Sequence, residues 1–129
     1  MASDSSALNF NSTTPIYLQI AQDIRDKILN QELQAGAQIM STTQYATTYR
    51  INPATANKAF TILQNEGLIY KQRGIGMFVT DNAEEILRKT GQQTYVNSTL
   101  APAINEGLAL GFTSTDILSL IHTLLEETK

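Results

Sequence analysis

The fold is decided by residues 41–80, which have the sequence STTQYATTYRINPATANKAFTILQNEGLIYKQRGIGMFVT. Ser41 and Gln44 form a capping-box pattern, which predicts the start of a short helix that ends near Arg50. Asn52-Pro53 places a good N-cap residue before a proline and predicts the start of a second helix. Two helices separated by so tight a turn are typical of a helix-turn-helix.

Two short β-favouring runs follow the second helix. Gly67 can adopt the left-handed conformation that ends a helix, and residues 68–72 and 77–80 are rich in branched and aromatic side chains. Residues 73–76 contain two glycines, so they predict the loop of a hairpin. We call this hairpin the wing, because it directly follows a helix-turn-helix.

An amphipathic helix is predicted ahead of this stretch. We expect Thr14 to be its N-cap and Pro15 its first residue, since proline has no N–H to leave unpaired there. Isoleucines recur every fourth residue to about Asn30, which is close to the helical period. They predict a buried stripe made by Ile16, Ile20, Ile24 and Ile28. Leu8 and Phe10 interrupt a polar N-terminal segment and are expected to dock on the same core.

The remaining residues predict a tail of short helices. Residues 83–89 favour a helix, several weak helix formers follow, and Pro102 is expected to kink or restart the helix. Gly111 is a candidate end of one helix, and the Thr113–Asp116 pair resembles the cap of the next. Such short helices are too small to enclose a core of their own.

We therefore expect the apolar stripe of the tail to pack against a second copy of the chain. The residues expected at this interface are Ile104, Leu108, Ile117, Ile121, Leu124 and Leu125. Packing back onto the winged helix within a monomer is the alternative. The predicted fold class is mainly α with a small β-hairpin. A winged helix-turn-helix domain over residues 1–82 is followed by a short helical dimerisation arm over residues 83–129.

Charge is unevenly distributed along the chain, whose net charge is −3. Residues 39–80 contain four basic side chains and one acidic side chain, whereas residues 83–129 contain three basic and six acidic ones. A basic middle suits contact with phosphates, and an acidic tail suits contact with protein. Chance scattering of ordinary surface charge is the alternative explanation.

Cysteine is absent, which excludes disulfides and thiolate metal sites. The first residues lack the pattern of a signal peptide, and no stretch approaches the roughly 20 apolar residues that a membrane helix needs. We therefore expect a cytoplasmic protein with no cofactor and no membrane partner.

Four motifs in the same order resemble the GntR family of bacterial repressors. They are Thr14-Pro15-Ile16-Tyr17-Leu18-Gln19-Ile20, Asn52-Pro53-Ala54-Thr55-Ala56, Gln64-Asn65-Glu66-Gly67-Leu68-Ile69-Tyr70 and Arg73-Gly74-Ile75-Gly76-Met77-Phe78-Val79. The short tail is similar to that of the YtrA subfamily, whereas most members carry a larger ligand-binding domain. The resemblance implies a homodimer that binds a palindromic operator in double-stranded DNA and represses transcription.

The family's DNA contacts fall on the starts of two helices and on the wing tip. Carried over, the implied DNA-binding residues are Ser41, Thr42, Thr43, Gln44, Arg50, Ala54, Thr55, Asn57, Lys58, Arg73, Gly74 and Gly76. Thr43 and Asn57 stand where the family usually has arginine, whose bidentate contacts neither residue can form. Arg50 replaces a usual glycine, and Ile75 stands where a basic residue is common. We therefore expect modest affinity and a site that leans toward A·T pairs.

Two other classes of function stay open at this point. The lost arginines and the acidic total favour a winged helix that has lost DNA binding and acts as a protein-interaction module. A small-molecule sensor that uses the groove between two tails is a further candidate, although the sequence names no effector. An enzyme is not expected, because the one histidine, His122, lies in the apolar-rich last helix. The glycines of the wing also lack the spacing and the lysine of a phosphate loop.

Overall fold

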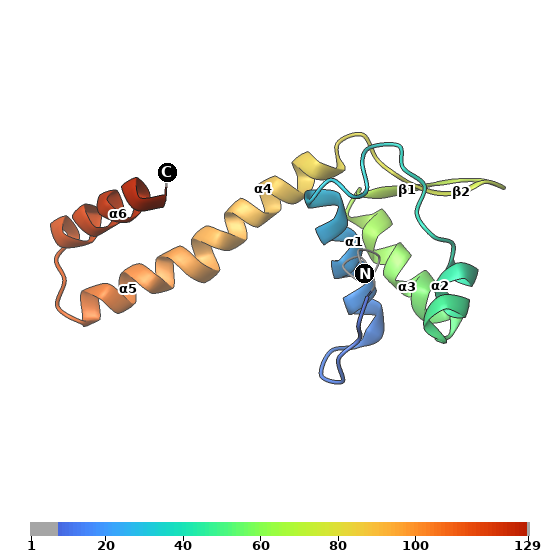
Figure 1. The fold of residues 1–129 in the computed structure, drawn as a ribbon, viewed down its shortest axis with the longest axis horizontal. Helices are drawn as coiled ribbons and strands as arrows, with labels where there is room; N and C mark the ends of the chain where they lie inside the picture. The colour runs from blue at the N-terminus through green and yellow to red at the C-terminus, as the bar shows by residue number, and fades with distance from the viewer. Residues whose placement is uncertain (1–7, 129) are drawn as a thin grey trace. The chain divides into compact units, whose positions relative to one another are not determined.

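The computed structural model of the protein describes residues 8–128, which fall into two compact units. The first unit extends to Arg88 and the second begins at Lys89. Figure 1 shows the first unit as a group of helices with a β-hairpin beside them, and the second as helices alone. The predicted fold class, mainly helical with one small hairpin, is confirmed.

A three-helix cluster and a two-stranded antiparallel sheet make up most of the first unit. The elements are α1 (Ile16–Leu29), α2 (Thr42–Tyr49), α3 (Pro53–Asn65), β1 (Ile69–Gln72) and β2 (Gly76–Val79). Both α1 and α2 pack against α3, and α3 packs against β1. The three residues between α2 and α3 form the tight turn of a helix-turn-helix, and β1 and β2 form the predicted wing (Figure 1).

The isoleucine stripe of α1 lies at the centre of the core. Ile20 and Ile24 are completely buried, Ile28 is nearly so, and Ile16 is partly buried at the start of the helix. Each such side chain stabilises the fold by roughly 1.5–3 kcal/mol when it leaves water. The stripe therefore holds α1 against the rest of the helix-turn-helix, as its spacing predicted.

Local capping starts α2 and α3 where the sequence predicted. The Ser41 hydroxyl accepts a hydrogen bond from the Gln44 N–H at 3.1 Å, and the Gln44 side chain accepts one from the Ser41 N–H at 2.7 Å. Asn52 Oδ1 accepts a hydrogen bond from the Ala54 N–H at 2.9 Å, with Pro53 at the first helical position. Each cap satisfies N–H groups that a helix leaves unpaired and is worth about 1 kcal/mol.

The predicted start of α1 is wrong by one residue. Pro15, not Thr14, is the N-cap, and the helix begins at Ile16. The Gln19 side chain accepts a hydrogen bond from the Asn11 N–H and donates one to the Thr14 carbonyl. The Thr14 hydroxyl was expected to cap α1. Instead, the side-chain amide of Gln19 holds the turn ahead of the helix.

The N-terminal segment docks on the core, as predicted for Leu8 and Phe10. The Phe10 ring meets the edge of Tyr49 at 5.5 Å, and Tyr49 stacks on Tyr45 at 5.7 Å between ring centroids. Tyr45 in turn meets Phe60 of α3 at 5.7 Å, edge to face. Burial raises the pKa of Tyr45 well above its ordinary value, with Asp23 and Tyr49 adding to the shift, so this ring stays neutral. The aromatic chain joins the N-terminal segment, α2 and α3.

Residues 36–39 lie along the wing in a way that the sequence did not predict. The Gly36 N–H donates to the Val79 carbonyl, the Val79 N–H donates to the Ala37 carbonyl, and the Ile39 N–H donates to the Met77 carbonyl. This segment therefore satisfies the outer edge of β2, which a two-stranded hairpin would leave unpaired. The wing is held from outside the hairpin.

The second unit consists of helices that the sequence placed only in part. α4 (Ala83–Tyr95) begins in the first unit, and η2 (Val96–Leu100), α5 (Ala101–Ala109) and α6 (Ser114–Thr128) follow. The chain stays helical between Gly91 and Pro102, through the weak helix formers. The element η2 is a π-helix whose wider turn lets the Ala101 N–H donate to the Val96 carbonyl, five residues back. Pro102 has no N–H to place and follows this turn directly.

The loop between α5 and α6 is capped as predicted. Gly111 has a φ of +101°, its N–H donates to the Leu108 carbonyl, and the Phe112 N–H donates to the Gly107 carbonyl, which is a Schellman motif. Asp116 and Thr113 exchange hydrogen bonds at 2.9 and 3.0 Å. The Thr113 N–H and hydroxyl that face it hold the pKa of the Asp116 carboxyl below its usual value.

Candidate nucleic-acid interface

The N-terminus of α2 carries four of the residues that the sequence assigned to DNA. Ser41 and Gln44 satisfy each other in the capping box. Thr43 is exposed and makes no side-chain hydrogen bond among the residues that the structure describes, while Thr42 is partly buried. The start of this helix thus presents a hydroxyl of Thr43 and unpaired backbone N–H groups, which together favour an anion.

The N-terminus of α3 presents Ala54 and Asn57 to solvent, with Thr55 partly buried beside them. Asn57 uses only its backbone carbonyl, which accepts from the Thr61 hydroxyl, so its side-chain amide stays available. Lys58 is exposed, and its ammonium lies 4.1 Å from the centroid of the Tyr17 ring on α1. This cation–π contact, which the sequence did not predict, holds the Lys58 ammonium beside α1, near the start of α3.

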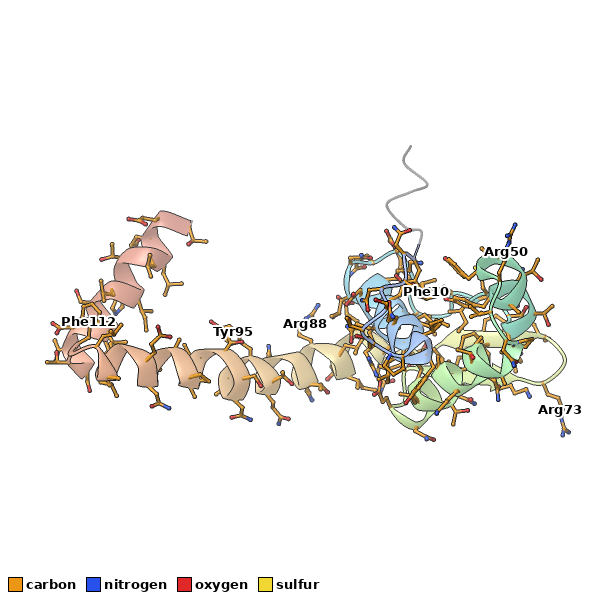
Figure 2. The ribbon with its side chains drawn as sticks, turned by 90° about the horizontal axis from the view of Figure 1, so that it is seen from below. Phe10, Arg50, Arg73, Arg88, Tyr95 and Phe112 are labelled. Atoms are coloured by element: carbon orange, nitrogen blue, oxygen red, sulfur yellow. The ribbon has the colours of Figure 1, made fainter. Side chains whose placement is uncertain are left out.

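Arg50 ends α2 in the left-handed conformation, with φ at 56° and ψ at 49°. A residue with a Cβ pays roughly 1–2 kcal/mol for this conformation, which explains why glycine is usual here. The Arg50 side chain points away from the first unit (Figure 2). Arg50 therefore strains the backbone, but it places on the surface a guanidinium group that a glycine at this position would lack.

The wing tip carries Arg73, Gly74, Ile75 and Gly76. Figure 2 shows the Arg73 side chain extending beyond the hairpin. Gly74 and Gly76 both have positive φ, at +78° and +148°. The carbonyl of Ile75 accepts a hydrogen bond at 3.0 Å from Nε2 of Gln38, which lies in the segment beside β2. Sequence reasoning missed Gln38, because no spacing pattern links it to a loop 37 residues away.

Ion pairing separates the basic residues of the first unit into two groups. Arg25 forms a bidentate pair with Glu66, Lys27 lies 2.9 Å from Asp23, and Arg88 lies 2.6 Å from Glu84. The second group has no ion pair within the described residues 8–128 and consists of Arg50, Lys58, Lys71 and Arg73. The unpaired positive charges thus belong to the helix-turn-helix and the wing.

Apolar side chains remain exposed throughout the second unit. None of its described residues is buried. Among the predicted interface residues, Ile104, Ile117 and Ile121 are partly buried, whereas Leu108, Leu124 and Leu125 are exposed. Six further large apolar side chains outside the predicted interface residues are also exposed, which are Tyr95, Val96, Leu110, Phe112, Leu118 and Leu120.

The described residues contain no cluster of three or more His, Cys, Asp or Glu side chains arranged to hold a metal ion. No helix in this part of the chain has the length and apolar character needed to cross a bilayer.

Replacing Gly76 with alanine should lower the free energy of unfolding by about 2–3 kcal/mol. The φ of +148° is strained for any residue with a Cβ. A Cβ at Gly76 would also lie 2.5 Å from Nε2 of Gln38, so this flexible side chain must shift, and we expect its hydrogen bond to the Ile75 carbonyl to be lost. Gly74→Ala is the control in the same loop, because its φ of +78° lies in the left-handed region that other residues can adopt and nothing lies within 4 Å of the new Cβ. It should cost only about 1 kcal/mol. Urea unfolding of both variants measures the difference, and equal losses would show that the Gln38 contact contributes nothing.

Comparison with known proteins identifies the fold and the family. Residues 16–79 match the family described as "Bacterial regulatory proteins, gntR family". The HTH-type transcriptional repressor YtrA of Bacillus subtilis is 34% identical over 93 residues, which cover 72% of this chain and 71% of YtrA. The HTH-type transcriptional regulator YhcF of the same organism is 29% identical, over 91% of this chain and 95% of YhcF.

A solved structure supports the same assignment. The crystal structure of a transcriptional regulator from Oenococcus oeni is similar over 92% of this chain and 98% of its own, with 25% identity and a TM-score of 0.76. The similarity therefore extends over the helix-turn-helix, the wing and most of the helical tail. The regulators to which the chain is similar are transcription factors. The chain belongs to the GntR family of bacterial helix-turn-helix transcription regulators.

Proposed function

We propose that this chain is a sequence-specific DNA-binding repressor that acts as a homodimer on a palindromic operator. In this proposal residues 1–82 contact DNA and residues 83–129 form the dimer. The repressor role is supported by the similarity to YtrA of Bacillus subtilis, which is named as a transcriptional repressor. Because the partner is bacterial operator DNA, the protein would act in the cytoplasm.

The observation that carries this proposal is the set of basic side chains without ion pairs. Arg50, Lys58, Lys71 and Arg73 keep their charges unneutralised within residues 8–128, although the chain as a whole is acidic. Neutralising phosphates releases condensed counterions, and this release supplies much of the affinity for DNA. For binding to DNA, the unpaired positive charges on the helix-turn-helix and the wing therefore matter more than the net charge of −3 of the whole chain.

Each part of the interface has a distinct role in this proposal. The start of α3 enters the major groove, where Ala54, Thr55, Asn57 and Lys58 face base edges. The free amide of Asn57 suits an adenine, because it can both donate and accept. Thr43 and the first N–H groups of α2 meet phosphates. Arg73 reaches the minor groove, where Gly74 and Gly76 let the backbone come close.

The exposed apolar surface of the second unit supports the dimer. Helices without a single buried residue among 89–128 cannot be stabilised by their own core. Exposed apolar side chains in this number are typical of an interface between subunits. A two-fold dimer also matches the symmetry of a palindromic operator.

Fluorescence anisotropy tests the DNA contacts, with a duplex selected by the protein from a random library. We expect binding to weaken steeply with salt, and Lys58→Ala and Arg73→Ala each to weaken it about fivefold and to reduce the salt slope by about one. Arg88→Ala is the control, because it removes the same charge from a residue already paired with Glu84. It should leave the slope unchanged.

The alternative function is a protein-interaction module that has lost DNA binding. Two observations favour it: Thr43 and Asn57 lack the charge of arginine, and the Lys58 ammonium is partly engaged by Tyr17. The same titration separates the two functions. If no selected duplex binds at low salt, or if affinity does not depend on salt, the repressor proposal fails and the protein-interaction module is favoured.

A further inference from the structure

We infer that Ile75 gives the wing a preference for A·T over G·C pairs in the minor groove, and that Gln38 is the residue that positions it. This inference rests on the proposed DNA-binding function. It adds a base preference at a position where a basic residue, which would be attracted to phosphates of any sequence, is common in the family.

Ile75 is exposed, yet its backbone is held in place. Its side chain is 59% exposed at the tip of the wing. Its N–H donates to the Gln72 carbonyl at 2.9 Å, and its carbonyl accepts from Gln38 Nε2 at 3.0 Å. The side chain is also β-branched, so it has few rotamers to lose on contact. An apolar group is therefore presented to the DNA in a defined position.

Gln38 reaches the wing tip from outside the hairpin. The residue forms an isolated β-bridge with Phe78, which fixes its backbone beside β2. A Cβ on Gly76 would lie only 2.5 Å from Nε2 of Gln38, so the present position of this amide depends on that glycine. Gln38 and Gly76 together set the direction of Ile75.

The chemistry of the minor groove distinguishes the two kinds of base pair at this point. An A·T pair presents only acceptors there, whereas a G·C pair adds the N2 amino donor of guanine, which projects from the floor of the groove. An isoleucine against that amino group removes its water and offers no acceptor in return. Arg73, two residues away, can donate to the acceptors that an A·T pair presents.

The size of the apolar group argues for DNA and against a protein partner at this tip. Within the loop of residues 73–76, Ile75 is the one large apolar side chain, and Arg73 beside it lacks an ion pair within the described residues. The other exposed large apolar side chain of the wing, Tyr70, lies on β1 and stacks on Phe78. A docking surface for a protein requires a much larger contiguous apolar patch. One apolar side chain beside a cation suits a groove lined by phosphates.

Competition with synthetic duplexes tests the inference on the full chain. Poly(dI-dC) lacks the N2 amino group but keeps the major-groove pattern of poly(dG-dC). For the unsubstituted protein we expect poly(dI-dC) to displace a bound fluorescent duplex about tenfold better than poly(dG-dC) does. Ile75→Val should keep this ratio. Ile75→Thr has nearly the same shape as Ile75→Val but carries a hydroxyl, which can accept from guanine, in place of a methyl group, so it should bring the ratio close to one.

Gln38→Leu provides a second arm, because it removes the hydrogen bond to the Ile75 carbonyl without changing charge. It should reduce the ratio several-fold and leave the salt slope unaltered, since no phosphate contact is lost. Equal competition by the two duplexes, or a ratio that persists in Ile75→Thr, overturns the inference while the DNA-binding function stands. If no duplex binds the unsubstituted protein, the proposed function itself fails.

Discussion

Replacing Leu118 and Leu125 with glutamate should convert the proposed dimer into a monomer and weaken binding to the proposed palindromic operator about 100-fold or more. These residues are seven positions apart on α6, so they share one face, and they are 60% and 57% exposed. A different face of α6 packs against α5 of the same chain, where the Ile117 side chain lies beside Gly107. The two glutamates should therefore disrupt contact with a second copy and leave the pairing of α5 with α6 intact.

The expected loss of affinity follows from the two half-sites of a palindrome. A dimer that has bound one half-site is held near the other at a high effective concentration, and a monomer is not. Light scattering after gel filtration gives the mass of each variant, and anisotropy gives its affinity for the selected duplex. Ser119→Glu with Thr123→Glu is the control, since it adds the same charge to the polar face of α6. The proposed dimer interface would be contradicted if the unsubstituted protein is monomeric, or if the variant with both Leu118→Glu and Leu125→Glu stays dimeric.

The helix-turn-helix was predictable because the signals that build it are local. Ser41 and Gln44 cap one helix within four residues, and Asn52 caps the next within three. Gly67 adopts the predicted positive φ after α3. Hydrogen bonds over such short separations depend little on the rest of the fold, so sequence patterns describe them well.

The contacts that adjust the site are non-local and could not be predicted. Gln38 bonds to Ile75 across 37 residues, and Lys58 lies over Tyr17 on a different helix. Thr14 was expected to cap α1, but the Gln19 side chain holds that turn. In each case the contact forms because the fold brings two side chains close together. The spacing of residues along a single sequence does not reveal which side chains become neighbours in this way.

The tail shows both kinds of outcome. Gly111 and the Thr113–Asp116 cap were predicted, because they again involve neighbours in sequence. The path through Pro102 was not, because a proline can break a helix or follow a widened turn. Here the turn of η2 widens, so the helix continues.

Replacing Phe60 with alanine should lower the free energy of unfolding by about 3–5 kcal/mol, the largest loss that we expect from one substitution. Phe60 is nearly completely buried and meets Tyr45, which is the buried residue of α2. An eight-residue helix is not stable alone in water, so α2 depends on this contact. Most natural domains have a free energy of unfolding of only about 5–15 kcal/mol. A substantial fraction of the variant should therefore be unfolded at moderately raised temperature and unable to bind DNA.

Phe60→Leu separates the loss of volume from the loss of the aromatic contact. Leucine fills most of the space and keeps the site apolar, so we expect it to cost only about 1–1.5 kcal/mol. Urea unfolding followed by circular dichroism measures both variants under the same conditions. A loss below about 1.5 kcal/mol for Phe60→Ala would mean that Tyr45 finds another partner. The attachment of α2 would then rest on the contact between Tyr49 and Phe10. Because the proposed interface needs the starts of α2 and α3 held together, this packing is what connects the core to the contact with DNA.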